Sequence, residues 1–134
     1  MPLLYRDSPL NSIWEGSGNV AALDVLRAMG REPESLPAFL AECELAAGAD
    51  ARFDRHLARV REGLGGLTSE EPQWHARRVV EGLGQALQGS LVLRHSPPEV
   101  ADAFCARLED GGRAVGTLPG GVAAEPIIER ALAV

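Results

Sequence analysis

The residues best suited to chemistry lie close together near the N-terminus, in the run Trp14-Glu15-Gly16-Ser17-Gly18-Asn19. Glu15 stands between an indole and a glycine, just before an expected helix whose unpaired N–H groups attract anions. A carboxylate held beside an indole and away from water has a raised pKa, which suits a general base acting on a weakly acidic proton. Ser17 and Asn19 are able to cap that helix or to contact a phosphate.

A simpler interpretation uses the same residues without catalysis. Glu15 is then a solvated loop residue, and Ser17 or Asn19 acts only as the N-cap of the following helix. From the residues alone we favour this simpler interpretation, and both stay open at this point.

Apolar residues repeat with a helical period along most of the chain, which predicts an all-α bundle of five to six helices. The expected helices cover residues 20–29, 35–47, 50–64, 71–95, 96–111 and 126–132. Ser35 is the expected cap of the second helix, and Ser96 with Glu99 forms a capping box at the start of the fifth.

The longest expected helix, between Glu71 and His95, carries one apolar stripe and two unusual glycines. Gly82 and Gly89 lie one heptad apart, and each costs about 1 kcal/mol relative to alanine in a helix interior. We therefore expect a neighbouring backbone to approach closely at both positions. The predicted stripe consists of Ala76, Val80, Leu83, Leu87 and Leu91.

Two segments fall outside the helical pattern. Residues 1–19 form an apolar N-terminal segment in which Pro2, Pro9, Gly16 and Gly18 interrupt any period, and such a segment cannot bury itself. Residues 111–122 are rich in glycine and are predicted to be a loop. The remaining residues, 20–134, are expected to form the helical bundle.

The charge composition argues against several kinds of partner. The chain has 13 basic and 19 acidic residues, giving a net charge of −6, and all of its basic residues are arginine. Such acidity disfavours a general binder of nucleic-acid backbones. No apolar run approaches the ~18 residues of a membrane span, so we expect a soluble, cytoplasmic protein without a membrane partner.

The cysteines and histidines indicate structural roles. Cys43 and Cys105 lie in apolar helical patterns without CxxC spacing, so both are expected to be reduced and buried. His56, His75 and His95 fall on separate helical segments without ligands at metal-binding spacing. No metal site is predicted from this pattern.

The arginines form two groups that resemble nucleic-acid contacts. Arg52, Arg55 and Arg59 share one helix face and are able to follow a phosphate backbone, whereas Arg77 and Arg78 are interpreted as a solvated face. Acidic residues at helical spacing interleave with the first group, which favours ion pairs within the helix over duplex DNA. These acidic residues are Asp50, Asp54 and Glu62.

The motif near the N-terminus and two later segments also carry a family resemblance. The run Asn11-Ser12-Ile13-Trp14-Glu15-Gly16-Ser17-Gly18-Asn19, continued by Leu23-Asp24-Val25-Leu26-Arg27, resembles the C-terminal helical domain of acyl-CoA dehydrogenases. More narrowly, it is similar to the AidB-like branch of alkylation-response flavoproteins. Residues 101–105 and 112–119 resemble the tail of the same branch, so the resemblance spans nearly the whole chain.

The resemblance implies roles for four residues of the motif. Glu15 matches the base that removes the α-proton of an acyl-CoA while a hydride passes to N5 of FAD. Ser17 and Asn19 match the family's FAD contacts, and Trp14 is expected to pack near the acyl or flavin pocket. The chain departs from the commoner pattern at three positions: Trp14 replaces Tyr, Ser17 replaces Thr and Asn19 replaces Gln. The larger Trp14 implies a narrower acyl pocket, and the Asn19 side chain, one methylene shorter, extends less far toward FAD.

The resemblance also limits what this chain is expected to do alone. Family members carry an N-terminal helical domain and a central β-domain before this motif, and those domains supply most of the FAD and acyl-CoA sites. We therefore expect residues 1–19 and 20–134 to form one partial domain of a larger flavoenzyme, with no turnover by itself. We also expect a homo-oligomer, held partly by the apolar N-terminal segment. The alternative is a noncatalytic module for DNA binding or oligomerisation, and the net charge argues against DNA.

Overall fold

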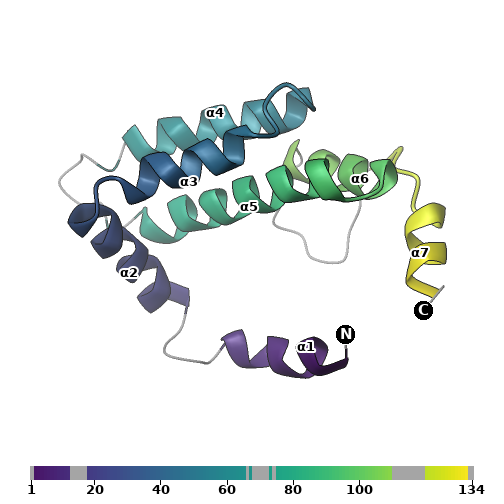
Figure 1. Cartoon of the computed structure of the whole chain (residues 1–134), viewed down its shortest axis with the longest axis horizontal. Helices are drawn as coiled ribbons and strands as arrows, with labels where there is room; N and C mark the ends of the chain where they lie inside the picture. The colour runs from purple at the N-terminus through teal and green to yellow at the C-terminus, as the bar shows by residue number, and fades with distance from the viewer. Residues whose placement is uncertain are drawn as a thin grey trace.

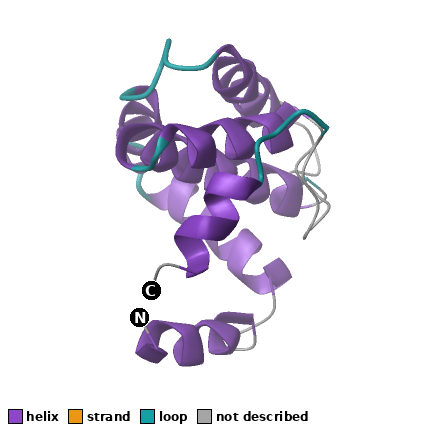
Figure 2. Cartoon of the chain, turned by 90° about the vertical axis from the view of Figure 1, so that its right-hand side faces the viewer, coloured by secondary structure: helices purple, strands orange, loops and turns teal. Residues whose placement is uncertain are grey.

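The computed structural model describes residues 2–12, 18–65, 67, 73, 75–109 and 120–132. Within these residues the chain contains seven α-helices and no strand, which confirms the all-α bundle and adds one helix to the expected count (Figures 1 and 2). The helices are α1 (Pro2–Asp7), α2 (Gly18–Arg31), α3 (Ser35–Glu44), α4 (Ala51–Gly65), α5 (Ala76–His95), α6 (Pro98–Glu109) and α7 (Glu125–Leu132). A short 3-10 helix, η1 (Ser8–Ser12), follows α1.

Helix α5 is the centre of the bundle, because α2, α3, α4 and α6 all pack against it. Figure 1 shows α3 and α4 running alongside α5, α2 near its beginning and α6 near its end. Helix α4 also packs against α6. The 20 residues of α5 therefore connect the segment that carries the motif to the remainder of the bundle.

The core combines one phenylalanine ring with leucine, valine, alanine and cysteine side chains. Phe53 of α4 is fully buried, and its ring lies against Gly89 of α5: a Cβ at Gly89 would be 2.8 Å from two atoms of that ring. At Gly82, a Cβ would be 3.2 Å from Cγ2 of Val60. Both glycines are closely approached, but the prediction of a neighbouring backbone is wrong, because the nearest group is in each case a side chain of α4.

The buried face of α5 differs from the predicted stripe. Leu91 is 42% exposed, and Val80 and Leu87 are only half-buried. Helices contact α5 from several directions, so Ala76 and Leu83 of the predicted stripe are buried as expected, whereas small residues outside it are buried at the close contacts. The buried residues are Ala76, Val79, Leu83, Ala86, Gly89 and Ser90.

Both predicted serine caps are wrong. Helix α3 begins at Ser35 itself, and the Ser35 hydroxyl donates to the carbonyl of Glu32 at 2.7 Å. Helix α6 begins at Pro98, and the carbonyl of Pro97 accepts the first amide hydrogen bonds of that helix. Ser96 instead ends α5, because its amide still donates to a carbonyl of the preceding turn. Ser35 therefore bonds to the connection that follows α2, and Ser96 bonds to the last turn of α5.

The N-terminal segment contains regular structure that the interrupted sequence pattern did not predict. Pro2 begins α1 at a position where its missing N–H costs nothing, and α1 packs against η1. Leu3, Leu4 and Tyr5 are 69%, 68% and 81% exposed. Figure 1 shows α1 standing apart from α3, α4 and α5. Residues 2–12 are therefore helical, and the side chains of Leu3, Leu4 and Tyr5 remain in contact with solvent.

The C-terminal part of the chain ends in a helix that is largely exposed. Of the loop predicted at residues 111–122, only Gly120, Gly121 and Val122 lie among the described residues, where the two glycines form a turn. Gly121 has a φ of 90°, a backbone conformation that favours glycine. Helix α7 follows, as predicted from Pro126, and packs against α6 without burying any residue completely.

Because Phe53 lies against Gly89, adding one methyl group at Gly89 is expected to destabilise the fold. Gly89→Ala is expected to lower the free energy of unfolding by about 1–3 kcal/mol, because the buried ring has to shift. Gly84→Ala is the matched control, since a Cβ there meets nothing within 4 Å and alanine favours the helix by about 1 kcal/mol. Urea denaturation measures both changes. Equal stability of the two variants would contradict the contact.

Candidate functional site

The structure describes one of the four predicted motif residues. Trp14, Glu15 and Ser17 lie outside the described residues, whereas Asn19 is the second residue of α2. The helix begins at Gly18, two residues earlier than predicted. Asn19 is therefore in the first turn of α2, and the interpretation of Asn19 as its N-cap is wrong.

Arg77 of α5 lies over this end of α2. Its Nη1 donates to Oδ1 of Asn19 at 3.0 Å, and a Cβ at Gly18 would be 3.4 Å from its Nη2. No carboxylate among the described residues forms an ion pair with Arg77. The sequence pattern predicted only a solvated face for Arg77. Its partner Asn19 lies 58 positions away, and helical periodicity gives no sign of such a distant contact.

Two positive features meet at this helix end. The first-turn N–H groups of the 14-residue helix α2 carry the positive end of its dipole, and no acidic residue lies in that turn. The guanidinium of Arg77 adds a full positive charge at the same place. Asn19 accepts a hydrogen bond from one N–H group of Arg77 and so holds the guanidinium in position. The arrangement is suited to an anionic group such as a phosphate.

The arginine row of α4 is occupied by partners within the molecule. The predicted pairing within the helix is wrong for two of its three acidic residues: among the described residues only Asp50, just before α4, forms an ion pair with the row, and the other carboxylate partners belong to α6, which packs against α4. These contacts leave fewer N–H donors and less unpaired positive charge on the three arginines for a phosphate backbone. They join Arg52 to Asp50 (2.6 Å) and Asp102 (2.7 Å), Arg55 to Glu109, and Arg59 to the carbonyl of Leu108 (3.3 Å).

The two cysteines are buried and free of disulfides, as predicted. Burial raises the pKa of Cys105 to about 11, and the nearby Asp50 carboxylate adds to the effect. Burial also raises the pKa of Cys43, with Glu42 contributing in the same direction. Both side chains are therefore thiols at neutral pH and poor nucleophiles.

His56 lies between α4 and α5 with only 6% of its surface exposed. Its Nε2 is 3.1 Å from the carbonyl oxygen of Gly82, and since that oxygen only accepts, Nε2 carries the proton. Burial lowers the pKa of His56, and the charge of Arg59 lowers it further. The ring is therefore neutral at pH 7.

Neither a metal centre nor a membrane span is found in the described part of the chain. Among those residues, no three His, Cys, Asp or Glu side chains are grouped so as to hold a metal ion. No helix there is long and apolar enough to cross a bilayer.

Comparison with known proteins identifies the family. The chain is 32% identical over 113 residues to an Escherichia coli (strain K12) protein named as an acyl-CoA dehydrogenase, AidB, which covers 78% of this chain. It is 36% identical over 64 residues, 48% of this chain, to acyl-CoA dehydrogenase family member 11 of Caenorhabditis elegans. No family model and no solved structure matches the chain.

The chain belongs to the acyl-CoA dehydrogenase family, which confirms the resemblance carried by the motif. Within that family it is similar to AidB along most of its own length. The matched stretch spans only 19% of the E. coli protein and 10% of the nematode protein.

The neutral, buried His56 predicts a loss of stability on acidification. The unfolded chain takes up this proton near pH 6.5, whereas the folded chain resists it to a lower pH. The free energy of unfolding is therefore expected to decrease as pH falls below 6.5, until the folded chain is protonated as well. Urea denaturation at several pH values measures it.

Two glutamine variants test that assignment. His56→Gln keeps a donor for the Gly82 carbonyl and is expected to lose this part of the pH dependence. His95→Gln changes an exposed histidine at the end of α5 and is expected to retain it. Identical pH profiles for the wild type and His56→Gln would contradict the prediction.

Proposed function

We propose that this chain is the C-terminal helical part of an FAD-dependent, acyl-CoA dehydrogenase-type oxidoreductase. In the complete enzyme, the reaction is the α,β-dehydrogenation of an acyl-CoA. The observation that carries the proposal is the pairing of Asn19, which matches a flavin contact of the family, with Arg77 at the positive end of α2. Membership of the family supports the same conclusion.

The residues at the beginning of α2 fit the phosphates of a flavin nucleotide. First-turn N–H groups and a guanidinium are common phosphate donors, and Arg77 keeps donors beyond the one given to Asn19. We assign Asn19 and Arg77 to cofactor binding, together with Ser17 and Trp14 of the same motif. FAD, when bound, supplies the hydride acceptor.

Glu15 is assigned the role of general base toward the acyl-CoA. It stands three positions before Gly18 in the chain, directly ahead of the α2 N-terminus. Its carboxylate would take the α-proton of the acyl group.

A role in assembly is the second candidate function, and the exposure of α1 favours it. Leu3, Leu4 and Tyr5 present a mostly exposed apolar surface on a helix that packs against η1. Such a surface is typical of a contact with another subunit or domain. The alternative of duplex DNA binding has less support, because the arginines at 52, 55 and 59 are engaged within the molecule.

The cofactor assignment predicts weak FAD binding by the 134-residue chain without turnover of acyl-CoA. Quenching of flavin fluorescence measures the affinity. Arg77→Gln and Asn19→Ala are expected to weaken binding at least about fivefold, because each removes a hydrogen-bonding group at the site. Arg31→Gln is the matched control, since it removes the same charge at the other end of α2.

Two results would count against this assignment. Equal FAD affinity of the wild type and Arg77→Gln would exclude the site at α2. FAD-dependent reduction of an electron acceptor by an acyl-CoA, catalysed by this chain alone, would exclude the expectation of no turnover.

The exposed apolar face of α1 predicts self-association of this chain. Light scattering is expected to show a mass that rises with protein concentration, and the double variant Leu3→Glu/Leu4→Glu is expected to remain monomeric. Leu45→Glu is the control, because Leu45 is similarly exposed (62%) but follows α3. A monomeric wild type over a wide concentration range would exclude this surface as an oligomer contact.

A further inference from the structure

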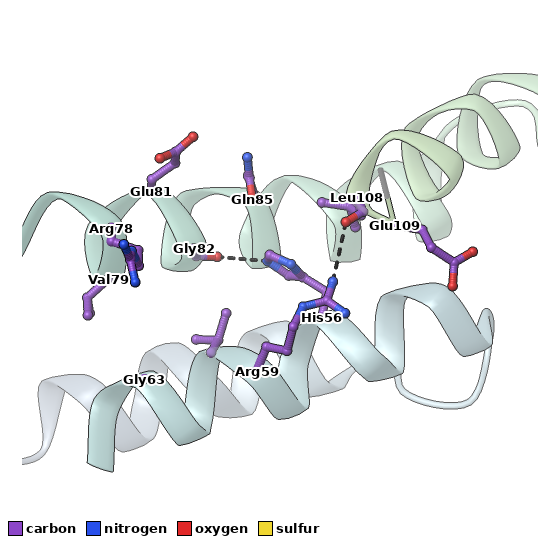
Figure 3. Close-up of a pocket in the computed structure, with 11 residues that line it drawn as sticks. His56, Arg59, Gly63, Arg78, Val79, Glu81, Gly82, Gln85, Leu108 and Glu109 are labelled. Carbon is purple, nitrogen blue, oxygen red and sulfur yellow. Dashed lines mark hydrogen bonds between the residues drawn. The ribbon is translucent and has the colours of Figure 1, made fainter. Parts of the chain in front are cut away.

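We propose that the pocket between α4, α5 and α6 binds a small organic monocarboxylate, a single carboxylate attached to a compact apolar body. The pocket has a volume of about 440 Å³, within the range of small-molecule sites (Figure 3). Its chemistry is set by two arginines, an apolar floor and a neutral histidine. The proposal does not depend on the flavin assignment, because Arg78 lines the pocket whereas Arg77 contacts Asn19.

The charges that line the pocket favour one negative charge on the ligand. Arg59 and Arg78 form no ion pair with any carboxylate in the described part of the chain. Glu109 is paired with Arg55, so Glu81 is the acidic residue of the lining without such an ion pair. The two guanidinium groups and the Glu81 carboxylate together leave the lining with one net positive charge. That charge matches a ligand with a single carboxylate better than a dianionic phosphate.

The walls of the pocket suit an apolar body. Val60, Val79 and Leu108 are buried hydrophobic residues that line it. Figure 3 shows the His56 ring between α4 and α5, with its N–H directed at the Gly82 carbonyl. That donor is already used within the protein, so the neutral His56 ring adds no charge to the lining. The Arg59 side chain reaches from α4 toward the end of α6, where it donates to a backbone carbonyl.

Gly63 provides a way to close the pocket without disturbing the core. It lines the pocket from α4, and a Cβ at this position would meet no atom within 4 Å. A larger side chain at Gly63 therefore has room to enter the pocket. Since leucine also favours a helix over glycine, such a variant is expected to stay folded.

Hexanoate and phenylacetate serve as probes in a titration of the full 134-residue chain followed by two-dimensional NMR of backbone amides. Both are expected to shift amides of α4, α5 and α6 around the pocket in a saturable way. Arg78→Gln is expected to weaken binding at least about tenfold, the typical effect of a lost charge-assisted contact. Gly63→Leu is expected to abolish it.

Two matched variants and two further probes control the experiment. Gly84→Leu adds the same side chain to α5 outside the pocket, and Arg61→Gln removes a charge from α4 where it pairs with Glu44. Both variants are expected to bind hexanoate as the wild type does. Hexanol is expected to bind at least about tenfold more weakly than hexanoate, and inorganic phosphate more weakly still.

Four outcomes would overturn the proposal. They are the absence of saturable shifts, unchanged binding in Gly63→Leu, equal affinity for hexanol, and tighter binding of phosphate than of hexanoate.

Discussion

The contact between the Phe53 ring and Gly89 sets the distance between α4 and α5, and the other parts of the structure depend on it. No side chain larger than hydrogen fits at Gly89 beneath the ring. The same close approach brings Val60 against Gly82 and lets His56 reach the Gly82 carbonyl. Because α2, α3 and α6 also pack on α5, this one spacing influences the whole bundle.

The distribution of arginine pairs explains where binding is expected. Most of the ion pairs connect helices, as in Arg61 with Glu44 and Arg94 with Glu42. Exposed pairs of this kind add little stability each, but they occupy charges that would otherwise attract anions. Arg77 and Arg78, adjacent at the beginning of α5, have no such ion pair in the described part of the chain. One contacts the first turn of α2 and the other lines the pocket, so both proposed sites depend on α5.

Family membership and the exposed N-terminal helix suggest how this domain would function. The relatives are far longer than the stretch that matches, and the two proposed flavin contacts that the structure describes, Asn19 of α2 and Arg77 of α5, meet at the beginning of α2. A site of that kind supplies only part of a cofactor pocket, which agrees with a chain that contributes one wall of a larger assembly. The apolar face of α1 offers a surface through which such an assembly would form.

The sequence by itself determined the all-α class, most helix positions and the family, because helical periodicity and the Trp14–Asn19 motif are local patterns. The cost of glycine inside a helix pointed to crowding at Gly82 and Gly89, but not to the α4 side chains that cause it, and Gly84 of the same helix has open space beside it. Only the tertiary structure decided which face of α5 is buried, which partners the α4 arginines take, and that Arg77 reaches Asn19. Those features depend on which helices meet, and contacts between residues about 50 positions apart leave no periodic signal in the chain.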